Sequence, residues 1–386
     1  MNYNSIQPQA HTISPQEKWP TVTLGDFIEE TNKRNTNEAI TDVKGISTKK
    51  EFREPNSRVD KNNLHNYKLV NHQEFAYVPT TDTWRCLAVC LSEQESPFVV
   101  SPIYITFKIK DNSKLLPKYL QLFFLRHETD RYARFNSWGS ARENFNWDDM
   151  CRIKIILPPI KIQQSYIDTY SGLTTLINEN ETLVRTLEAA VQAYVVRCRK
   201  KWPLQPIGNF ILPFSRKNIN NLSLSFMGLN KEKSIIPTPA NTTNLDKQKY
   251  NILKKGEFAF SGMQTGRDEC IRIALSEINE DILLSPAYTT FKIKDTNKIL
   301  PEFLLLNFKS DEMDRLGWFK SDSSVRSNLD WNRFCEIKIP LPPIKVQEAI
   351  VALYHCAEEA RKIAAEAKAQ LAEVCPAMIQ RASHHP

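Results

Sequence analysis

The first candidates for chemistry are polar residues that occur twice at the same spacing. The pattern Ser140-x-Arg142-x-Asn144-x-x-Trp147 recurs as Ser324-x-Arg326-x-Asn328-x-x-Trp331. Ser and Asn hydrogen-bond phosphate oxygens, and Arg binds a phosphate or a guanine edge through two hydrogen bonds. The pattern therefore predicts contacts to a nucleic acid, carried mainly by Arg142 and Arg326. The structural alternative is a helix cap with Trp147 in the core and Arg142 in an ion pair.

A second group of candidates lies in segments that differ between the two halves of the chain. Segment 44–68 carries seven Lys or Arg residues against three acidic ones. Such runs are often only solvated surface, but here they coincide with the divergent segments, which favours nucleic-acid binding. Base readout is predicted from Lys49, Lys50, Arg53, Trp84, Arg85, Arg134 and Trp138 in the first half. The equivalents in the second half are Lys231, Lys233, Gln264, Arg267 and Lys320.

The sequence carries no recognisable catalytic or metal-binding pattern. It has no GxGxxG or Walker loop, and its ten glycines leave little scope for one. His65, His72 and His127 have no counterparts in the second half, although a duplicated active site would duplicate its histidine. The eight cysteines form no paired CxxC motif and are expected to be buried thiols. We therefore expect no catalytic residue, no bound metal and no cofactor in this chain.

Two acidic residues do recur, and both have plain structural interpretations. Asp111 returns as Asp295 in a predicted strand–helix turn, where Asp commonly caps the backbone. Asp130 returns as Asp314, and its neighbour Arg131 suggests a local ion pair.

These residues sit in a chain whose sequence is duplicated. Residues 101–163 realign on residues 285–347 at a constant shift of 184, with 34 of 63 positions identical. A shift of 183 extends the match back to Trp19, which corresponds to Trp202. A repeat of this length indicates a duplicated domain.

Some blocks of the repeat share almost nothing. These are residues 46–66 against 229–249, and 77–85 against 260–269. Surface loops drift readily, so the difference could be neutral. The alternative, which the concentration into blocks favours, is two related modules that recognise two different targets.

Each copy is predicted to have an α+β fold with a mixed or antiparallel sheet. Candidate strands cover 75–78, 86–91 and 98–109, with an edge or bend at Ser101-Pro102, and a Gly-containing turn is expected at 44–46. A helix should begin at Pro117 and run to about residue 130. Residues 152–157 alternate as a strand.

A long helix is predicted to follow each copy. In the first, apolar residues recur at steps of four and three from Tyr166 to Tyr194, which is typical of a coiled coil. The core of this seam is Tyr170, Leu173, Ile177, Asn180, Val184, Leu187 and Val191. A helix over about 160–200 would be roughly 60 Å long. Its expected partner is the Ala-rich helix at about 345–375.

Length and composition complete the organisation. Residues 1–18 are polar and predict a disordered tail. Predicted domains follow at 19–157 and 202–341, with the central long helix at 158–201 and the C-terminal one at 342–380. No stretch approaches the ~18 apolar residues needed to cross a bilayer, so we expect a cytoplasmic protein with no membrane partner. The net charge of +7 permits a polyanionic partner without requiring one.

The junction between domain and long helix resembles a known family. Trp147 leads into Leu157-Pro158-Pro159-Ile160-Lys161, and Trp331 leads into Leu341-Pro342-Pro343-Ile344-Lys345. This strand-to-helix junction, found twice in one chain, resembles the specificity subunit of type I restriction-modification systems in its two-domain form. The likeness covers about residues 19–380. The family often has Glu-Gln after the prolines, where this chain has Ile162-Gln163 and Val346-Gln347.

The resemblance implies a function and a set of partners. Each variable domain would be a target-recognition domain that reads half of a split double-stranded DNA sequence. The two long helices would pair as an antiparallel coiled coil, which gives the chain an internal pseudo-two-fold. They would set the distance between half-sites and dock two methyltransferase subunits, which are joined by restriction and translocase subunits. S-adenosylmethionine, ATP and Mg would belong to those partners, and this subunit would catalyse nothing.

Two functions from other classes remain open at this point. One is a stand-alone tandem-domain DNA-binding regulator, which would bind DNA tightly without a methyltransferase. The other is a protein-assembly scaffold, whose binding would lack the steep salt dependence of phosphate contacts.

Overall fold

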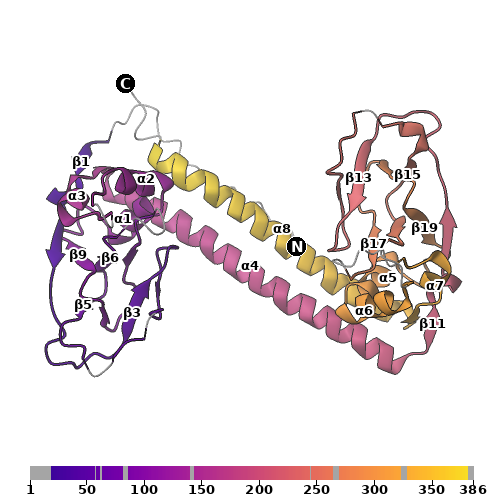
Figure 1. Cartoon of the computed structure of the whole chain (residues 1–386), viewed down its shortest axis with the longest axis horizontal. Coiled ribbons are helices and arrows are strands. Elements are labelled where there is room, and N and C mark those ends of the chain that lie inside the picture. The colour runs from indigo at the N-terminus through magenta and orange to yellow at the C-terminus, as the bar shows by residue number, and fades with distance from the viewer. Residues whose placement is uncertain are drawn as a thin grey trace. The chain divides into compact units, whose positions relative to one another are not determined.

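The computed structural model of the 386-residue chain describes residues 19–56, 58–60, 63–80, 86–139, 143–243, 245–263, 269–322 and 328–380, with side chains to residue 372. The chain divides into two compact units. The first is Met1–Ile177 with Ala365–Pro386, and the second is Asn178–Ala364 (Figure 1). Each of the two long helices is therefore shared between the units.

The first unit contains two four-stranded sheets and one two-stranded sheet. The inner sheet has the order β2-β9-β6-β7, all antiparallel, and the outer sheet has the order β4-β3-β8-β5. In the outer sheet β3 and β8 run parallel, so the predicted mixed sheet is confirmed. The inner strands are β2 (Ile28–Thr31), β6 (Phe75–Tyr77), β7 (Val89–Leu91) and β9 (Ile105–Ile109). The outer strands are β3 (Val43–Ile46), β4 (Phe52–Arg53), β5 (Lys68–Val70) and β8 (Phe98–Val100). The two-stranded sheet pairs β1 (Thr21–Thr23) with β10 (Lys154–Ile156).

The second unit repeats this topology strand for strand. Its sheets have the orders β12-β19-β16-β17, β14-β13-β18-β15 and β11-β20. The inner strands are β12 (Ile211–Phe214), β16 (Phe258–Ser261), β17 (Arg272–Leu275) and β19 (Thr289–Ile293). The others are β11 (Leu204–Pro206), β13 (Ser225–Leu229), β14 (Ile235–Pro237), β15 (Asn251–Leu253), β18 (Ile282–Leu284) and β20 (Lys338–Pro340). Short 3-10 turns lie at Leu24–Asp26, Ile207–Asn209 and Lys247–Lys249.

The inner sheet is buried on both faces, which explains its continuous apolar strands. In β6, Phe75 and Tyr77 face a core that includes Phe107 and Phe124, whereas Ala76 faces the outer sheet with Phe98. Alternate residues of a strand point to opposite faces, so both parities must be apolar here. Phe75 and Phe107 stack with ring centroids 4.8 Å apart. The second unit repeats the stack with Phe258 and Phe291, also at 4.8 Å.

The short helices differ from the prediction. The helix expected from Pro117 to about 130 is two helices, α1 (Pro117–Phe124) and α2 (His127–Phe135). At this break the Phe123 carbonyl accepts from the Thr129 hydroxyl at 2.8 Å and from the Arg126 amide at 3.4 Å. The second unit has the same break between α5 (Pro301–Phe308) and α6 (Asp311–Lys320). The turn expected at 44–46 is also wrong, because these residues belong to strand β3.

Two short helices lead into the long ones. These are α3 (Trp147–Arg152) and α7 (Trp331–Cys335). Gly25 lies against α3 so closely that an added Cβ would be 2.8 Å from Cys151 Cβ. Gly208 repeats this at 2.9 Å from Cys335 Cβ, so the two recurring Gly–Cys pairs are packing contacts.

The long helices are α4 (Ile160–Lys201) and α8 (Ile344–Gln380). Of the predicted seam in α4, Ile177 and Val191 are buried, and Tyr170, Leu173, Asn180, Val184 and Leu187 are partly buried. The stripe then departs from the heptad pattern, because Tyr194 is 46% exposed and Val195 is 2% exposed. A straight helix drifts relative to a 3.5-residue repeat, so the buried face moves on by one position.

Within the second unit, α4 and α8 run antiparallel. Glu188 pairs with Arg361, while Gln192 and Tyr354 line one cavity of about 310 Å³. Numbers therefore rise along α4 as they fall along α8. The small buried residues Ala357, Ala360 and Ala364 allow this close approach.

Each long helix is joined to its domain by a fully buried glutamine. Gln163 accepts a hydrogen bond from the Leu116 amide at 2.8 Å and donates to the carbonyls of Lys114 (2.9 Å) and Pro158 (2.8 Å). Gln347 makes the same three bonds to Leu300, Lys298 and Pro342 at 2.9 Å each. The side chain thus links the start of α1 to the start of α4. It satisfies three backbone groups that would otherwise be buried without a hydrogen-bond partner.

Replacing Gln163 by Leu should destabilise the first unit. The change keeps the volume but removes all three partners, at about 1–3 kcal/mol for each buried group left unsatisfied. The measurement is the midpoint of urea unfolding of the full chain. Gln164→Leu is the matched control, because Gln164 is exposed and bonds only the side chain of Asp168. Equal, small losses in both variants would contradict the role given to Gln163.

Candidate nucleic-acid interface

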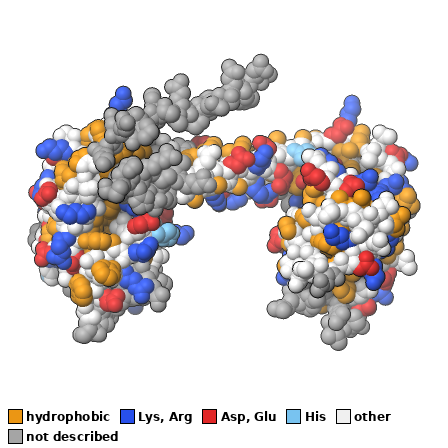
Figure 2. All heavy atoms as spheres, turned by 90° about the horizontal axis from the view of Figure 1, so that it is seen from above, with side chains coloured by type: hydrophobic (Ala, Val, Ile, Leu, Met, Phe, Trp, Pro, Cys, Tyr) orange, Lys and Arg blue, Asp and Glu red, His pale blue; other side chains and the backbone are white. Residues whose placement is uncertain are grey.

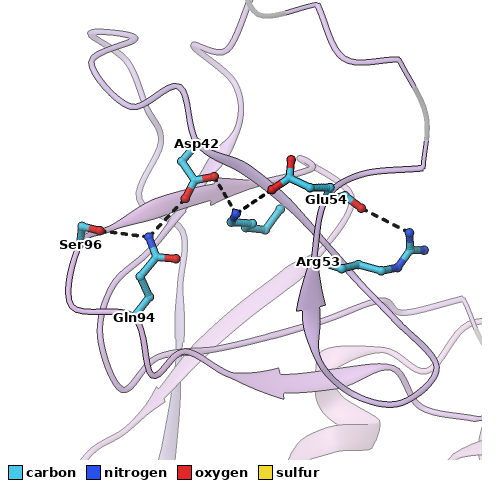
Figure 3. Close-up of polar contacts among 6 residues, drawn as sticks. Asp42, Arg53, Glu54, Gln94 and Ser96 are labelled. Atoms are coloured by element: carbon cyan, nitrogen blue, oxygen red, sulfur yellow. Dashed lines mark hydrogen bonds and ion pairs between the residues drawn. The ribbon is translucent and has the colours of Figure 1, made fainter. Parts of the chain in front are cut away.

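The hairpin β3–β4 presents the basic side chains of the first domain. Its register places Gly45 opposite Arg53 and Ile46 opposite Phe52. The Lys44 ammonium lies 3.0 Å from an Asp42 carboxylate oxygen and 2.9 Å from one of Glu54, and Gln94 donates to Asp42 (Figure 3). The hydrogen bonds that the Lys44 ammonium donates to Glu54 and Asp42 raise the pKa of Lys44. Lys44 is therefore a charge-compensated member of a surface network.

Arg53 belongs to the same network. Its guanidinium donates to the Glu54 carbonyl at 3.3 Å (Figure 3). It also donates to the Asn56 side chain. Lys44, Arg53 and Asn56 line a cavity of about 530 Å³ together with Tyr67 and Tyr104. The cavity therefore offers hydrogen-bond donors from the hairpin beside two aromatic side chains.

The equivalent hairpin of the second domain has the opposite chemistry. There Gly228 lies opposite Ile236 and Met227 opposite Pro237, in the register of Gly45 and Arg53. Met227 thus occupies the position of Lys44, and Ile236 that of Arg53. At these two positions the first domain has charged donors and the second has apolar side chains, of which Met227 packs on the core that contains Leu229.

Two predicted DNA contacts are wrong, because Lys50 and Lys233 are each only 5% exposed. Lys50 Nζ lies 2.8 Å from Asp130 Oδ1, and Lys233 Nζ lies 2.8 Å from Asp314. The expected pairing of Asp130 with its neighbour Arg131 gives way to this long-range pair. These lysines support the frame and are unavailable to a ligand. The sequence held a sign of this structural role, because Lys50 and Lys233 are identical within blocks that otherwise differ.

The twice-occurring motif is structural where the structure describes it. Asn144 accepts from the Thr80 hydroxyl at 3.2 Å, and its backbone pairs with Trp138. Trp147 packs on Phe107 with centroids 5.6 Å apart, and Trp331 packs on Phe291 at 5.5 Å. The Asn328 amide donates to the Asp322 carboxylate. Arg142 and Arg326, with Ser140 and Ser324, lie outside the described residues.

The other candidates fall into three groups. Lys49, Arg134, Trp138 and Lys231 are exposed, with Trp138 at 69%. Lys320 is partly buried and lies 3.6 Å from Glu336. Trp84, Arg85, Gln264 and Arg267 lie outside the described residues.

Two exposed aromatic residues were missed by sequence reasoning. Phe135 is 82% exposed at the end of α2, and its equivalent Phe319 is 85% exposed in α6. Their identity in both copies was visible in the sequence, but an apolar residue on a short helix is ordinarily assigned to the core. They lie next to Arg134 and Lys320, two predicted base contacts.

Charge over the surface is mixed. Figure 2 shows basic and acidic side chains interspersed over the visible face of each unit. Among the described residues, no group of three or more His, Cys, Asp and Glu side chains is placed to hold a metal ion. No helix in the described part of the chain is long and apolar enough to cross a membrane.

The protein therefore has two domains of the same fold, and their equivalent hairpins carry different side chains. Residues 16–192 and 212–371 each match the family model of the type I restriction modification DNA specificity domain. The chain belongs to this family and contains its domain twice. It is a type I restriction-modification specificity protein, as its resemblance implied.

Two solved structures are similar to this chain, and the first of them shares its fold. The S subunit of a type-I restriction-modification system from M. genitalium has 13% identity and a TM-score of 0.61, over 96% of this chain and 97% of that one. The HsdS subunit from Thermoanaerobacter tengcongensis has 14% identity and a TM-score of 0.42, over 95% and 97%. A comparison with curated protein sequences gives no match.

Lys49 and Lys50 allow contact with DNA to be separated from support of the fold. Lys49 lies exposed at the hairpin tip, so we expect Lys49→Gln to lower the slope of log K against log salt by about one, the effect of one phosphate contact. Lys50→Gln should leave the slope unchanged and lower the unfolding midpoint. Fluorescence anisotropy on duplex DNA at several salt concentrations measures the slope. If Lys50→Gln lowered the slope and Lys49→Gln did not, Lys50 would be the residue that contacts a phosphate.

Proposed function

We propose that this chain is the DNA sequence-recognition subunit of a type I restriction-modification complex, and that it reads a bipartite target with its two domains. The observation that carries the proposal is the pair of equivalent hairpins. Lys44 and Arg53 in one domain correspond by register to Met227 and Ile236 in the other. Charged donors suit guanine or phosphate oxygens, whereas apolar side chains suit the thymine methyl group.

The two long helices are proposed to set the spacing between half-sites and to dock two methyltransferase subunits. Supporting this, α4 is one continuous helix of 42 residues that begins in the first unit and ends in the second. Several of its apolar side chains remain exposed, including Leu176 at 39% and Leu183 at 46%. Exposed apolar residues on a helix suit a helical partner.

Catalysis is assigned to the partners. The methyltransferase subunits would bind S-adenosylmethionine and modify adenine, and the restriction and translocase subunits would use ATP and Mg. This chain would contribute recognition only, in the cytoplasm, where the DNA is.

A self-graft tests whether recognition is modular. Residues 19–157 are replaced by a second copy of residues 202–341, which end at the same Leu-Pro-Pro junction. With its native methyltransferase, the grafted chain should methylate sites that carry one half-site twice, because both domains then present the same side chains. Mapping methylated adenines in cellular DNA provides the measurement. An unchanged methylation motif would contradict recognition by separate domains. If neither the unaltered nor the grafted chain gave methylation, the result would favour a protein-assembly scaffold.

A helix deletion tests the spacing. Removing residues 178–181 from α4 and a matching turn from α8 shortens the pair by about 6 Å at 1.5 Å per residue. The spacer between methylated half-sites should then shorten by about two base pairs, with both half-sites unchanged. The same methylation map measures this. A spacer of the original length would refute the proposal that the two helices set the spacing.

A further inference from the structure

The two blocks that differ between the domains converge on a residue that does not differ. The tip and second strand of the hairpin β3–β4 lie in block 46–66, and Leu87 follows block 77–85 by two residues. Lys50 at the hairpin tip and the Leu87 amide both bond the carboxylate of Asp130 on α2. The second domain has the same convergence at Asp314 on α6. An identical side chain between variable segments is placed to hold them, because it contacts both.

The geometry in the first domain is a three-way clamp. Lys50 Nζ lies 2.8 Å from Asp130 Oδ1 and also donates to the Phe124 carbonyl at the end of α1. The Leu87 amide donates to the same Oδ1 at 3.0 Å. The side chains are 4% (Lys50) and 17% (Asp130) exposed. One carboxylate thus joins a hairpin tip, a helix and the first residues after a divergent block.

The second domain reproduces the clamp with a different sequence around it. Lys233 Nζ lies 2.8 Å from both carboxylate oxygens of Asp314, and the Ile271 amide donates to Oδ1 at 2.9 Å. Lys233 and Asp314 side chains are 4% and 20% exposed. The lysines share an unusual backbone as well, since Lys50 and Lys233 both have φ of 62°. A left-handed conformation is costly for a residue with a Cβ, so the surroundings must hold it there.

A buried ion pair of this kind specifies geometry more than it adds stability. Desolvation of the two charges offsets most of their attraction, whereas removing one partner leaves a buried charge. Bonds to both the ammonium and an amide fix the position of the hairpin tip relative to Leu87. The clamp is therefore suited to hold variable segments in a common register while their outward side chains change.

We infer that Lys50–Asp130 and Lys233–Asp314 are positioning pairs for base discrimination, each acting on one half-site through the variable segments that it joins. The inference rests on the proposed bipartite reading of DNA and adds the residues that hold the readers. None of the four residues touches DNA. Their effect on discrimination passes through the hairpin and the segment that ends at Leu87 or Ile271.

The experiment uses the complex of the full chain with its methyltransferase subunits. Methylation rates are measured on duplexes with the intact target, with one mismatched base pair in the first half-site, or with one in the second. The self-graft identifies which half-site belongs to the first domain. In Asp130→Asn the amide oxygen can still accept from the Leu87 amide and from Lys50, but the buried ammonium loses the negative charge that compensates it. We expect discrimination against the first-half mismatch, roughly tenfold or more for a specific reader, to fall toward one.

Discrimination at the other half-site is the internal control. It should stay unchanged in Asp130→Asn, and Asp314→Asn should give the reverse pattern. Glu128→Gln, on the same helix with a side chain 44% exposed, should change neither ratio. Lys50→Met is the second variant, and it serves if the Asn variant does not fold. A lower unfolding midpoint with both discrimination ratios intact would overturn the inference, because the pair would then only stabilise the domain. Equal loss at both half-sites would also overturn it.

Failure of the proposed function gives a different result. In that case the unaltered complex would show no dependence on one or both half-sites, before any variant is compared. A complex that discriminates normally at both half-sites, but whose Asp130→Asn variant does so equally well, rejects the positioning role alone.

Discussion

The buried hydrogen bonds of Gln163 and Gln347 are the interaction on which the rest of the structure depends. Each long helix leaves its domain at a corner where backbone groups of two segments are removed from water. An apolar corner would leave those groups unsatisfied, and an exposed corner would let the helix pivot. One amide side chain meets three backbone groups and thereby fixes the direction of the helix relative to the sheet. The Leu-Pro-Pro-Ile-Lys-x-Gln sequence is the same in both copies and supplies this glutamine at the start of each long helix.

With the helix fixed, the domain divides into parts that must stay and parts that can change. The Phe75–Phe107 stack, the Gly25–Cys151 contact and the Lys50–Asp130 pair all have identical counterparts in the second domain. Each depends on a close fit or a buried charge, where substitution is costly. Lys44 and Arg53 lie in a network on the surface of the first domain, and their counterparts are Met227 and Ile236. Between two copies of one domain, identity marks the frame and difference marks the surface available for recognition.

Much of the fold followed from the sequence, and the errors have specific physical causes. The repeat, the mixed sheet, the helix start at Pro117 and both long helices were predicted from periodicity and proline placement. The break after Phe124 was missed because apolar periodicity does not mark it, and Lys50, which bonds the Phe124 carbonyl, is distant in sequence. Tyr194 was placed in the seam because a heptad count ignores the slow rotation of a straight helix. Several candidate contacts, Arg142 and Trp84 among them, stay predictions.

The sequence by itself determined that this protein is a duplicated domain with two long helices and the junction of a specificity subunit, because those features are periodic or local. Only the tertiary structure decided which lysines are surface and which are support. Lys49 and Lys50 are adjacent and chemically identical, yet one is exposed and the other is 5% exposed against Asp130. That outcome depends on a left-handed turn and on an aspartate 80 residues away. Burial of a charge is set by contacts across the fold, and local sequence does not encode them.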